Sequence, residues 1–243
     1  MKRIAFAAIG ILLLGQTAAA EPTWSSIGFS TTASKAPQVV AAADKFMSSE
    51  VGKTFPGKLL LQVNTADGDD PATHTWVPIY KTVAEREAFI QSVQGKPAWN
   101  EFLGVMEKVS QPTSTVFYRT LKSWGDINDT DHVWAAYSFN VSDPAKLLAA
   151  VDALMASPTG QKFPGQVYLS QVVVGGISPV SHAISVGWAS EAEMEAWRAV
   201  RDPSPDWAAY QAASGPVAEF LGGTLARDIK SWGPATLKDL TAP

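Results

Sequence analysis

Phe55-Pro56-Gly57 and Lys122-Ser123-Trp124-Gly125 are two short motifs that each occur twice in this chain. The first recurs as Phe163-Pro164-Gly165 and the second as Lys230-Ser231-Trp232-Gly233. Both recurrences lie 108 positions downstream of the first occurrence. Self-similarity at one fixed offset indicates a repeated structural unit, so the sequence predicts a tandem duplication.

Identical residues between the two motifs keep the same offset of 108 positions. Pro71, His74, Ala84, Glu85, Glu87, Ala88, Pro97, Trp99 and Arg119 match Pro179, His182, Ala192, Glu193, Glu195, Ala196, Pro205, Trp207 and Arg227. We therefore define copy one as residues 21–125 and copy two as residues 132–233. Residues 126–131 form a short polar linker, and residues 234–243 are predicted to be a tail.

The first twenty residues are typical of a secretory signal peptide. Lys2 and Arg3 form a basic start, an apolar run follows, and Ala18-Ala19-Ala20 supplies small residues at a cleavage point. The apolar run is shorter than a membrane span requires. The sequence therefore predicts export to the periplasm or the medium, a mature chain that begins near Glu21, and no membrane insertion.

Composition excludes several classes of partner. Without Lys2 and Arg3, 17 of the 19 basic residues remain against 23 acidic ones, which gives a net charge of −6. A mildly acidic protein is poorly suited to bind nucleic acid. The chain has no cysteine, so disulfides and thiolate chemistry are absent and the apolar core must stabilise the fold.

Each copy shows the same predicted order of strands and helices. Strands are expected over residues 26–30, 58–63, 74–80 and 115–124 of copy one, and over residues 135–140, 166–174, 182–188 and 224–232 of copy two. The first helix carries an apolar stripe at Val39, Ala43 and Phe46, which Leu147, Val151 and Leu154 repeat. Capping boxes at Thr82 and Ser190 mark the second helical region. The order β-α-β-β-α-β predicts a four-stranded antiparallel sheet with helices on one face.

Two such units in one chain resemble the dimeric α+β barrel superfamily. There, two ferredoxin-like sheets pack into a barrel, either from two chains or from one duplicated chain. Antibiotic-biosynthesis-type monooxygenases, stress-responsive barrel proteins and chlorite-dismutase-like haem proteins share this architecture. The resemblance implies an α+β fold in which the copies form an intramolecular, pseudo-dimeric barrel. We expect the chain to be a monomer or a weak homo-oligomer. It carries no catalytic residues over, because one fold hosts unrelated functions.

His74 and His182 are matched histidines at the start of the third strand of each copy. One interpretation is an acid/base group or a haem or metal ligand that lines a cavity. The other is a half-buried structural histidine bonded to the preceding loop, because no further ligand stands at metal-binding spacing.

Arg119 and Arg227 are matched arginines on the apolar last strands. An arginine there must pair with a carboxylate or an anionic ligand, because an unpaired buried charge is very costly. It therefore either anchors an anionic ligand or pairs with a helix glutamate such as Glu87 or Glu195. We expect His and Arg of one copy to lie on strands separated by one neighbour, roughly 10 Å apart, where both could contact one ligand.

Three function classes remain open on the sequence. The first is an exported, non-catalytic protein that binds a small molecule in one or both copies, with His74, Arg119, His182 and Arg227 as candidate ligand-binding residues and no cofactor. The second is a cofactor-independent monooxygenase-like or isomerase-like enzyme acting on a small aromatic or polyketide-like compound. The third is a haem protein that uses one copy's histidine. The Lys-Ser-Trp-Gly motif and Trp99 and Trp207 are interpreted as structural.

Overall fold

The computed structural model describes residues 21–241, and the predicted signal peptide lies outside these residues. Copy one contains β1 (Thr23–Ser30), α1 (Ala36–Ser48), η1 (Gly52–Thr54), β2 (Lys58–Ala66), β3 (His74–Tyr80), α2 (Val83–Val93), α3 (Pro97–Val109) and β4 (Gln111–Gly125). Copy two contains β5 (Val133–Val141), α4 (Pro144–Ala156), η2 (Gly160–Lys162), β6 (Gln166–Gly175), β7 (His182–Trp188), α5 (Glu191–Arg201), α6 (Pro205–Ser214) and β8 (Ala218–Trp232). A short helix, α7 (Leu237–Thr241), follows copy two.

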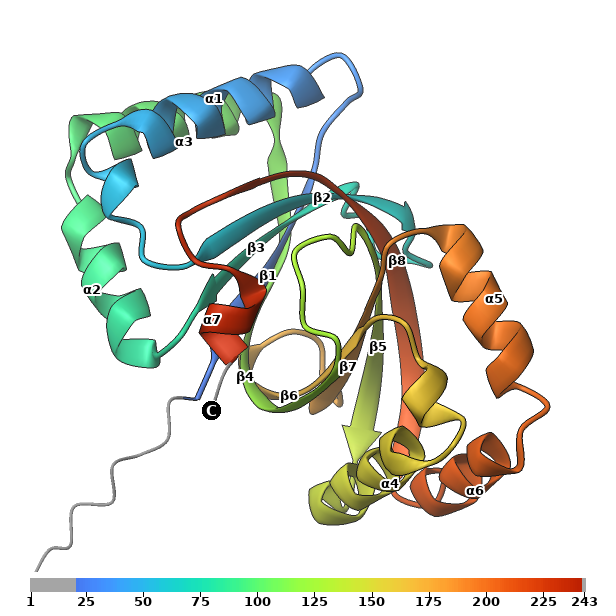
Figure 1. Ribbon diagram of the computed structural model, residues 1–243. Helices are drawn as coiled ribbons and strands as arrows, with labels where there is room; N and C mark the ends of the chain where they lie inside the picture. Colours follow the sequence, from blue (N-terminus) through green and yellow to red (C-terminus); the bar gives the residue numbers. More distant parts are fainter. Residues whose placement is uncertain (1–20, 242–243) are drawn as a thin grey trace, which may run out of the picture.

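The eight strands form one closed antiparallel barrel in the order β1-β3-β2-β8-β5-β7-β6-β4. Within each copy the first strand lies between the third and the last, as the repeat order predicts. The copies join edge to edge through β2–β8 and β4–β6, so neither sheet keeps a free edge. The predicted α+β fold with an intramolecular barrel is confirmed, and Figure 1 shows α1–α3 and α4–α6 as two separate helical layers outside it.

Local sequence signals explain where the helices begin. The Thr82 hydroxyl accepts a hydrogen bond from the Glu85 amide at 3.1 Å, and the Ser190 hydroxyl accepts one from Glu193 at 3.1 Å. The Asp143 carboxylate caps α4 in the same way, with Pro144 in the first turn. Side-chain caps satisfy amides that have no partner within the helix, which stabilises these starts by roughly 1 kcal/mol each.

Strand alternation divides the apolar residues between two regions. Outward residues of each sheet pack under the helices, where Leu61 and Trp76 represent the copy-one core and Leu169 and Trp188 the copy-two core. Inward residues face the barrel interior. The first helices supply the predicted stripe, because Val39, Ala43, Leu147 and Val151 are all buried.

The two repeated motifs contact each other across the copies. Gly233 lies so close to Gly57 that a Cβ atom on it would be 2.1 Å from the Gly57 carbonyl oxygen, and Gly125 has the same relation to Gly165. Both Gly125 and Gly233 also adopt a positive φ, which glycine tolerates without strain. Both motifs are therefore structural, as predicted for Lys-Ser-Trp-Gly, and they join copy one to copy two.

Lysine and tryptophan of the second motif extend this junction. Trp124 Nε1 donates to Asp152 on α4, and Trp232 Nε1 donates to Asp44 on α1, both at 2.8 Å. Lys122 and Lys230 pair with the same two carboxylates. Each tryptophan packs against the helical core of the other copy. The last strand of each copy thus fastens the first helix of the other.

Residues 234–241 are ordered and close one end of the barrel. Leu237 and Leu240 of α7 are buried, and Leu237 packs against Trp134 and Tyr168 inside the barrel. Figure 1 shows α7 at the end of the barrel where β1 begins. No helix among residues 21–241 is long and apolar enough to cross a membrane.

Candidate functional site

A cavity of about 400 Å³ lies in copy two between the outer face of the sheet and the helices. We call it the helix-side cavity. It is lined by residues of all four strands of copy two (β5, β6, β7 and β8), of α4, of the C-terminal half of α5 and of α6, and by Phe163. Eight of its lining residues are aromatic: Tyr137, Phe139, Phe163, Trp188, Trp197, Trp207, Tyr210 and Phe220.

Comparison of matched positions explains why copy two is hollow here. In copy one, the side chains of Trp76, Phe102 and Met106 meet in the helical core, where the rings of Trp76 and Phe102 lie 6.3 Å apart. The matched residues of copy two, 108 positions downstream, are Ile184, Tyr210 and Ser214, and all three line the cavity. Two of these replacements are much smaller. Protein cores are close-packed, so the lost atoms leave space.

One wall of the cavity is a stack of three planar groups. The Arg201 guanidinium lies 4.2 Å from the centroid of the Trp207 ring, and the Trp207 and Tyr210 rings are stacked at 4.8 Å. Arg201 also donates two hydrogen bonds to Asp202. Its charge is therefore already paired, and its plane contributes to a flat wall.

Few polar side chains line this cavity. The indole N–H of Trp188 is buried and has no hydrogen-bond partner within residues 21–241. Burial raises the pKa values of the Tyr137 and Tyr210 hydroxyls, so both phenols stay protonated at neutral pH. The cavity is thus a mainly aromatic site with neutral hydrogen-bonding groups.

The predicted histidines face the helical layers but line neither this cavity nor the barrel interior. His74 and His182 are both buried, with Nδ1 within hydrogen-bond distance of the preceding Thr73 and Ser181 hydroxyls, at 2.9 and 3.0 Å. His74 also stacks on Phe29. Burial lowers the pKa of both imidazoles, so they are neutral at pH 7. Nε2 of His182 has no partner among the residues that the structure describes.

The predicted arginines lie on the same outer face and are ion-paired. Arg227 donates to Glu191 at the start of α5, at 2.8 and 3.0 Å. Arg119 donates to Glu21 at 3.0 Å and to the Gln171 side chain at 2.8 Å. Neither arginine pairs with Glu87 or Glu195, the helix glutamates that the sequence had suggested. Both pairs are about half exposed, so each stabilises the fold by under about 1 kcal/mol.

Strand register separates His and Arg within one copy. Arg119 lies opposite Thr23 on β1, whereas His74 lies opposite Phe29, six residues further along the same strand. That stagger adds roughly 20 Å along the strand, so the two side chains of copy one do not converge.

Register instead aligns Arg119 of copy one with His182 of copy two. Arg119 lies opposite Gln171, and Gln171 lies opposite His182. The three residues form a polar row on the outer face of β4, β6 and β7. Nε of Arg119 and Nε2 of His182 are buried and unpaired within residues 21–241. Ligand binding by His74, Arg119, His182 and Arg227 stays a prediction.

The residues of the helix-side cavity do not fit a haem. Its lining residues within the described chain include no histidine, and the nearest candidates for an axial ligand are the protonated phenols of Tyr137 and Tyr210. Arg201, the only basic lining residue in that part of the chain, is already paired with Asp202. No cluster of three or more potential metal ligands occurs among residues 21–241.

Sequence reasoning missed the residues that shape this cavity. Ile184, Arg201, Tyr210 and Ser214 carry no recognised motif. The available signal was the comparison of side-chain size at matched positions, which shows Trp76 and Met106 replaced by smaller residues. Identical residues at matched positions revealed the duplication, whereas the cavity arises at matched positions where the two copies carry residues of different size.

Comparisons with known proteins agree with the geometry of the fold. No protein-family model matches the chain, and no curated protein sequence matches it. Among solved structures, a candidate monooxygenase from Lactobacillus acidophilus is similar with a TM-score of 0.61 at 11% identity, over 89% of this chain and 97% of that one. An anthrone oxidase-like protein is similar with a TM-score of 0.57 at 14% identity, over 88% and 93%. A candidate chlorite dismutase has a TM-score of 0.52 at 9% identity, over 91% and 97%.

This chain therefore shares with these three proteins the fold of an α+β barrel. The similarity extends over nearly the full length of both chains in each pair, so it covers both copies. At these identities the similarity concerns the fold alone.

Proposed function

We propose that this protein binds a flat, largely apolar small molecule in the helix-side cavity of copy two. The observation that carries the proposal is the replacement of Trp76 and Met106 by Ile184 and Ser214 at matched positions of the duplicated core. Copy one fills this region with its own side chains. A bound ligand would supply the contacts that copy two lacks.

The walls define the class of ligand. Aromatic rings favour a planar ligand that stacks on them, and the Trp207–Tyr210 wall presents such a face. The side chains of Tyr137, Tyr210 and Gln211 line the cavity and would supply hydrogen-bonding groups for an oxygen of the ligand. With Arg201 paired to Asp202, the site favours a neutral aromatic compound with a carbonyl or hydroxyl oxygen.

The lining residues favour binding over catalysis. Within residues 21–241 the cavity is lined by no carboxylate and no imidazole, so it offers no general base at neutral pH. A cofactor-independent oxidation of an aromatic substrate would begin with loss of a proton from carbon. The enzymatic alternative rests on fold similarity to a candidate monooxygenase and to an anthrone oxidase-like protein.

Filling the cavity tests the binding proposal. Ser214→Met supplies the copy-one side chain at a buried position, and Ala213→Met adds the same side chain at the exposed neighbouring position. We expect the neutral fluorophore N-phenyl-1-naphthylamine to bind the unmodified protein and Ala213→Met equally, and to bind Ser214→Met at least tenfold more weakly. Equal binding by a folded Ser214→Met protein would reject the cavity as the site.

Oxygen uptake distinguishes the enzymatic alternative. Oxidation of anthrone by one O₂ yields anthraquinone and one water, so uptake can be measured with an oxygen electrode against spontaneous oxidation in buffer. The binding proposal predicts no uptake above that background. Uptake by the unmodified protein that Ser214→Met abolishes would instead support the oxygenase.

We also propose that the protein is exported to the periplasm or the medium. The support is the basic, apolar and small-residue succession that ends at Ala20. N-terminal sequencing of native protein should give a start within a few residues of Glu21. A native product that retains Met1 would contradict export by this route.

A further inference from the structure

A second cavity, of about 260 Å³, lies inside the barrel and is independent of the helix-side cavity. An eight-stranded barrel is just wide enough for inward side chains to fill it or for one small ligand to occupy it. Here many inward residues from both copies are small: Ser26, Ala136, Ser138, Ala183, Ser185 and Thr224. Their side chains leave the middle of the barrel open.

Comparison of the two copies shows which side chain is present on the copy-one side of the barrel interior and absent on the copy-two side. On the copy-one side, Trp24 lies opposite Tyr118, and the two rings stack with centroids 4.1 Å apart and planes 13° apart. On the copy-two side, Trp134 lies opposite Ala226 at the matched register. Ala226 and Trp134 both line the cavity. At this strand position one tryptophan thus has a phenol ring stacked on it, whereas the other faces a methyl group. Trp134 has Tyr168, at 6.3 Å between ring centroids, and Leu237 as further neighbours.

The two tryptophans also differ in the groups that fix them. Trp24 Nε1 donates to the Ser170 hydroxyl at 3.1 Å, whereas Trp134 Nε1 donates to the Asp228 carboxylate at 3.2 Å. Gln62 donates to the other oxygen of Asp228 at 2.9 Å. Both indole planes are therefore held by hydrogen bonds, which prepares Trp134 as a fixed stacking surface.

The charge of the lining determines which ligands are excluded. Among residues 21–241, Asp70 is the only charged residue that lines the cavity, and Asp228 lies behind Gln62 and Trp134. With no basic side chain on the wall, an anion would be desolvated without compensation. The Tyr118 hydroxyl makes no hydrogen bond within the described chain, and burial raises its pKa to about 12, so it presents a neutral phenol.

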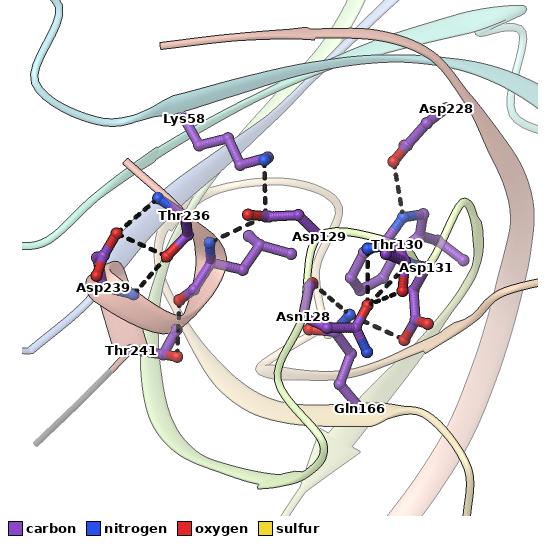
Figure 2. A network of polar contacts seen from close by, with 12 residues as sticks. Lys58, Asn128, Asp129, Thr130, Asp131, Gln166, Asp228, Thr236, Asp239 and Thr241 are labelled. Atoms are coloured by element: carbon purple, nitrogen blue, oxygen red, sulfur yellow. Dashed lines mark hydrogen bonds and ion pairs between the residues drawn. The ribbon is translucent and has the colours of Figure 1, made fainter. Parts of the chain in front are cut away.

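One end of the cavity is closed, which leaves the other for entry. Leu237 of α7 packs under Trp134 and Tyr168, and Asp129 holds this helix by accepting from the Leu237 amide at 3.1 Å and from Lys58 Nζ at 2.7 Å. Figure 2 shows these contacts beside the linker, where the Gln166 side chain donates to Asp131 at 2.9 Å. At the opposite end the lining includes Gly176 and the exposed Ile177.

We infer that the barrel interior is a second binding site, which takes a small neutral phenol whose ring lies against Trp134 where Ala226 leaves room. The ligand occupies the position that the Tyr118 ring has on the copy-one side. Ser185 lies opposite Ala136, the next inward residue after Trp134 on β5, and makes no side-chain hydrogen bond within residues 21–241, so its hydroxyl can pair with that of the ligand. This site is separate from the helix-side cavity, and the inference does not depend on the function proposed for that cavity.

The test uses 4-methylphenol, which reproduces the tyrosine side chain, and isothermal titration calorimetry on the full chain. The unmodified protein should bind it saturably. Ala226→Tyr supplies the ring from the chain itself and should weaken this binding at least tenfold, whereas Ser214→Met should leave it unchanged. The anion 4-methylbenzoate should bind at least tenfold more weakly than 4-methylphenol. Ala226→Tyr should retain binding of N-phenyl-1-naphthylamine, which separates the two sites.

Several outcomes would overturn the inference. These are no saturable binding of 4-methylphenol, unchanged binding by a folded Ala226→Tyr protein, loss of binding in Ser214→Met, or equal binding of the anion. If Ala226→Tyr does not fold, Ser138→Leu replaces it. Ser138 lies on β5, two inward positions after Trp134, and its substitution by leucine fills the cavity from that strand. The same criteria apply to this variant.

Discussion

Substitution of Asp44 tests whether the last strand of copy two fastens the first helix of copy one. Asp44 accepts from Trp232 Nε1 at 2.8 Å and pairs with Lys230 at 2.7 Å. Loss of a hydrogen bond from a partly buried indole costs roughly 1–2 kcal/mol. The half-exposed ion pair adds under about 1 kcal/mol. We expect Asp44→Ala to lose about 2 kcal/mol of unfolding free energy, which corresponds to a fall in Tm of about 4–8 °C for a chain of this size.

Matched variants separate the contribution of the Trp232 hydrogen bond from that of the Lys230 ion pair. Asp44→Asn keeps a neutral acceptor for Trp232 and should lose under about 1 kcal/mol, while Asp152→Ala at the matched position of copy two should behave like Asp44→Ala. Glu101→Ala removes an exposed pair with Lys45 and should change stability by less than about 0.5 kcal/mol. Urea unfolding followed by tryptophan fluorescence gives all four values. If Asp44→Ala is no more destabilised than Glu101→Ala, the proposed junction does not hold the copies together.

Acidification tests the same contact through its charge. The hydrogen bond from Lys230, followed by that from Trp232, holds the pKa of Asp44 below its ordinary 3.8. A carboxylate with a lowered folded pKa stabilises the protein above its unfolded pKa, and this contribution is lost as pH falls through the folded pKa. The difference in stability between the unmodified protein and Asp44→Asn should therefore shrink below about pH 4.

Three further predictions concern the histidines, the arginines and the halves of the chain. Burial lowers the folded pKa values of His74 and His182, so the stability that the two neutral imidazoles contribute is complete above pH 6.5 and is lost as pH falls below it. Tm should therefore drop between pH 7.5 and 5.5, and it should drop less in the double His→Gln variant. An equal change of Tm with pH in the two proteins would contradict this. Arg227→Met should lose under about 1 kcal/mol and retain N-phenyl-1-naphthylamine binding, and loss of binding would make Arg227 a ligand contact. Residues 21–125 expressed alone expose the edges of β2 and β4 and should dimerise or aggregate in light scattering, whereas a cooperative monomer would argue against an obligatory barrel.

Much of the fold was predictable from the sequence, because the duplication gave every element two independent readings. Residues 74–80 and 182–188 were predicted as strands and are strands with those bounds. Each predicted capping box forms the predicted hydrogen bond. The longest error is in the last strands, which begin four and six residues before the predicted starts at Thr115 and Thr224. Pro112 and the glycines of 222–223 hid these extensions, because such residues weaken a strand pattern.

The candidate sites were less predictable, because they depend on register and side-chain volume. Alternation shows which residues share a face, but the stagger of β1 against β3 and β4 places Arg119 far from His74 and in line with His182. Irregular pairing in β4 and β8 shifts this register, and no local pattern reveals it. Which positions become cavities depends on the combined size of residues distant in sequence, as Ile184 and Ser214 show.

The reciprocal fastening of strands and helices bears on how the two halves can diverge. In two separate chains, the contacts of Trp124 with α4 and of Trp232 with α1 would have to hold a dimer together against dilution. Within one chain the linker keeps the halves at a high effective concentration, so association no longer limits how much packing each half must retain. Because the halves are tethered, one half can acquire smaller core residues while the other stays fully packed. A symmetric dimer of identical chains cannot do this, because every substitution appears in both of its halves.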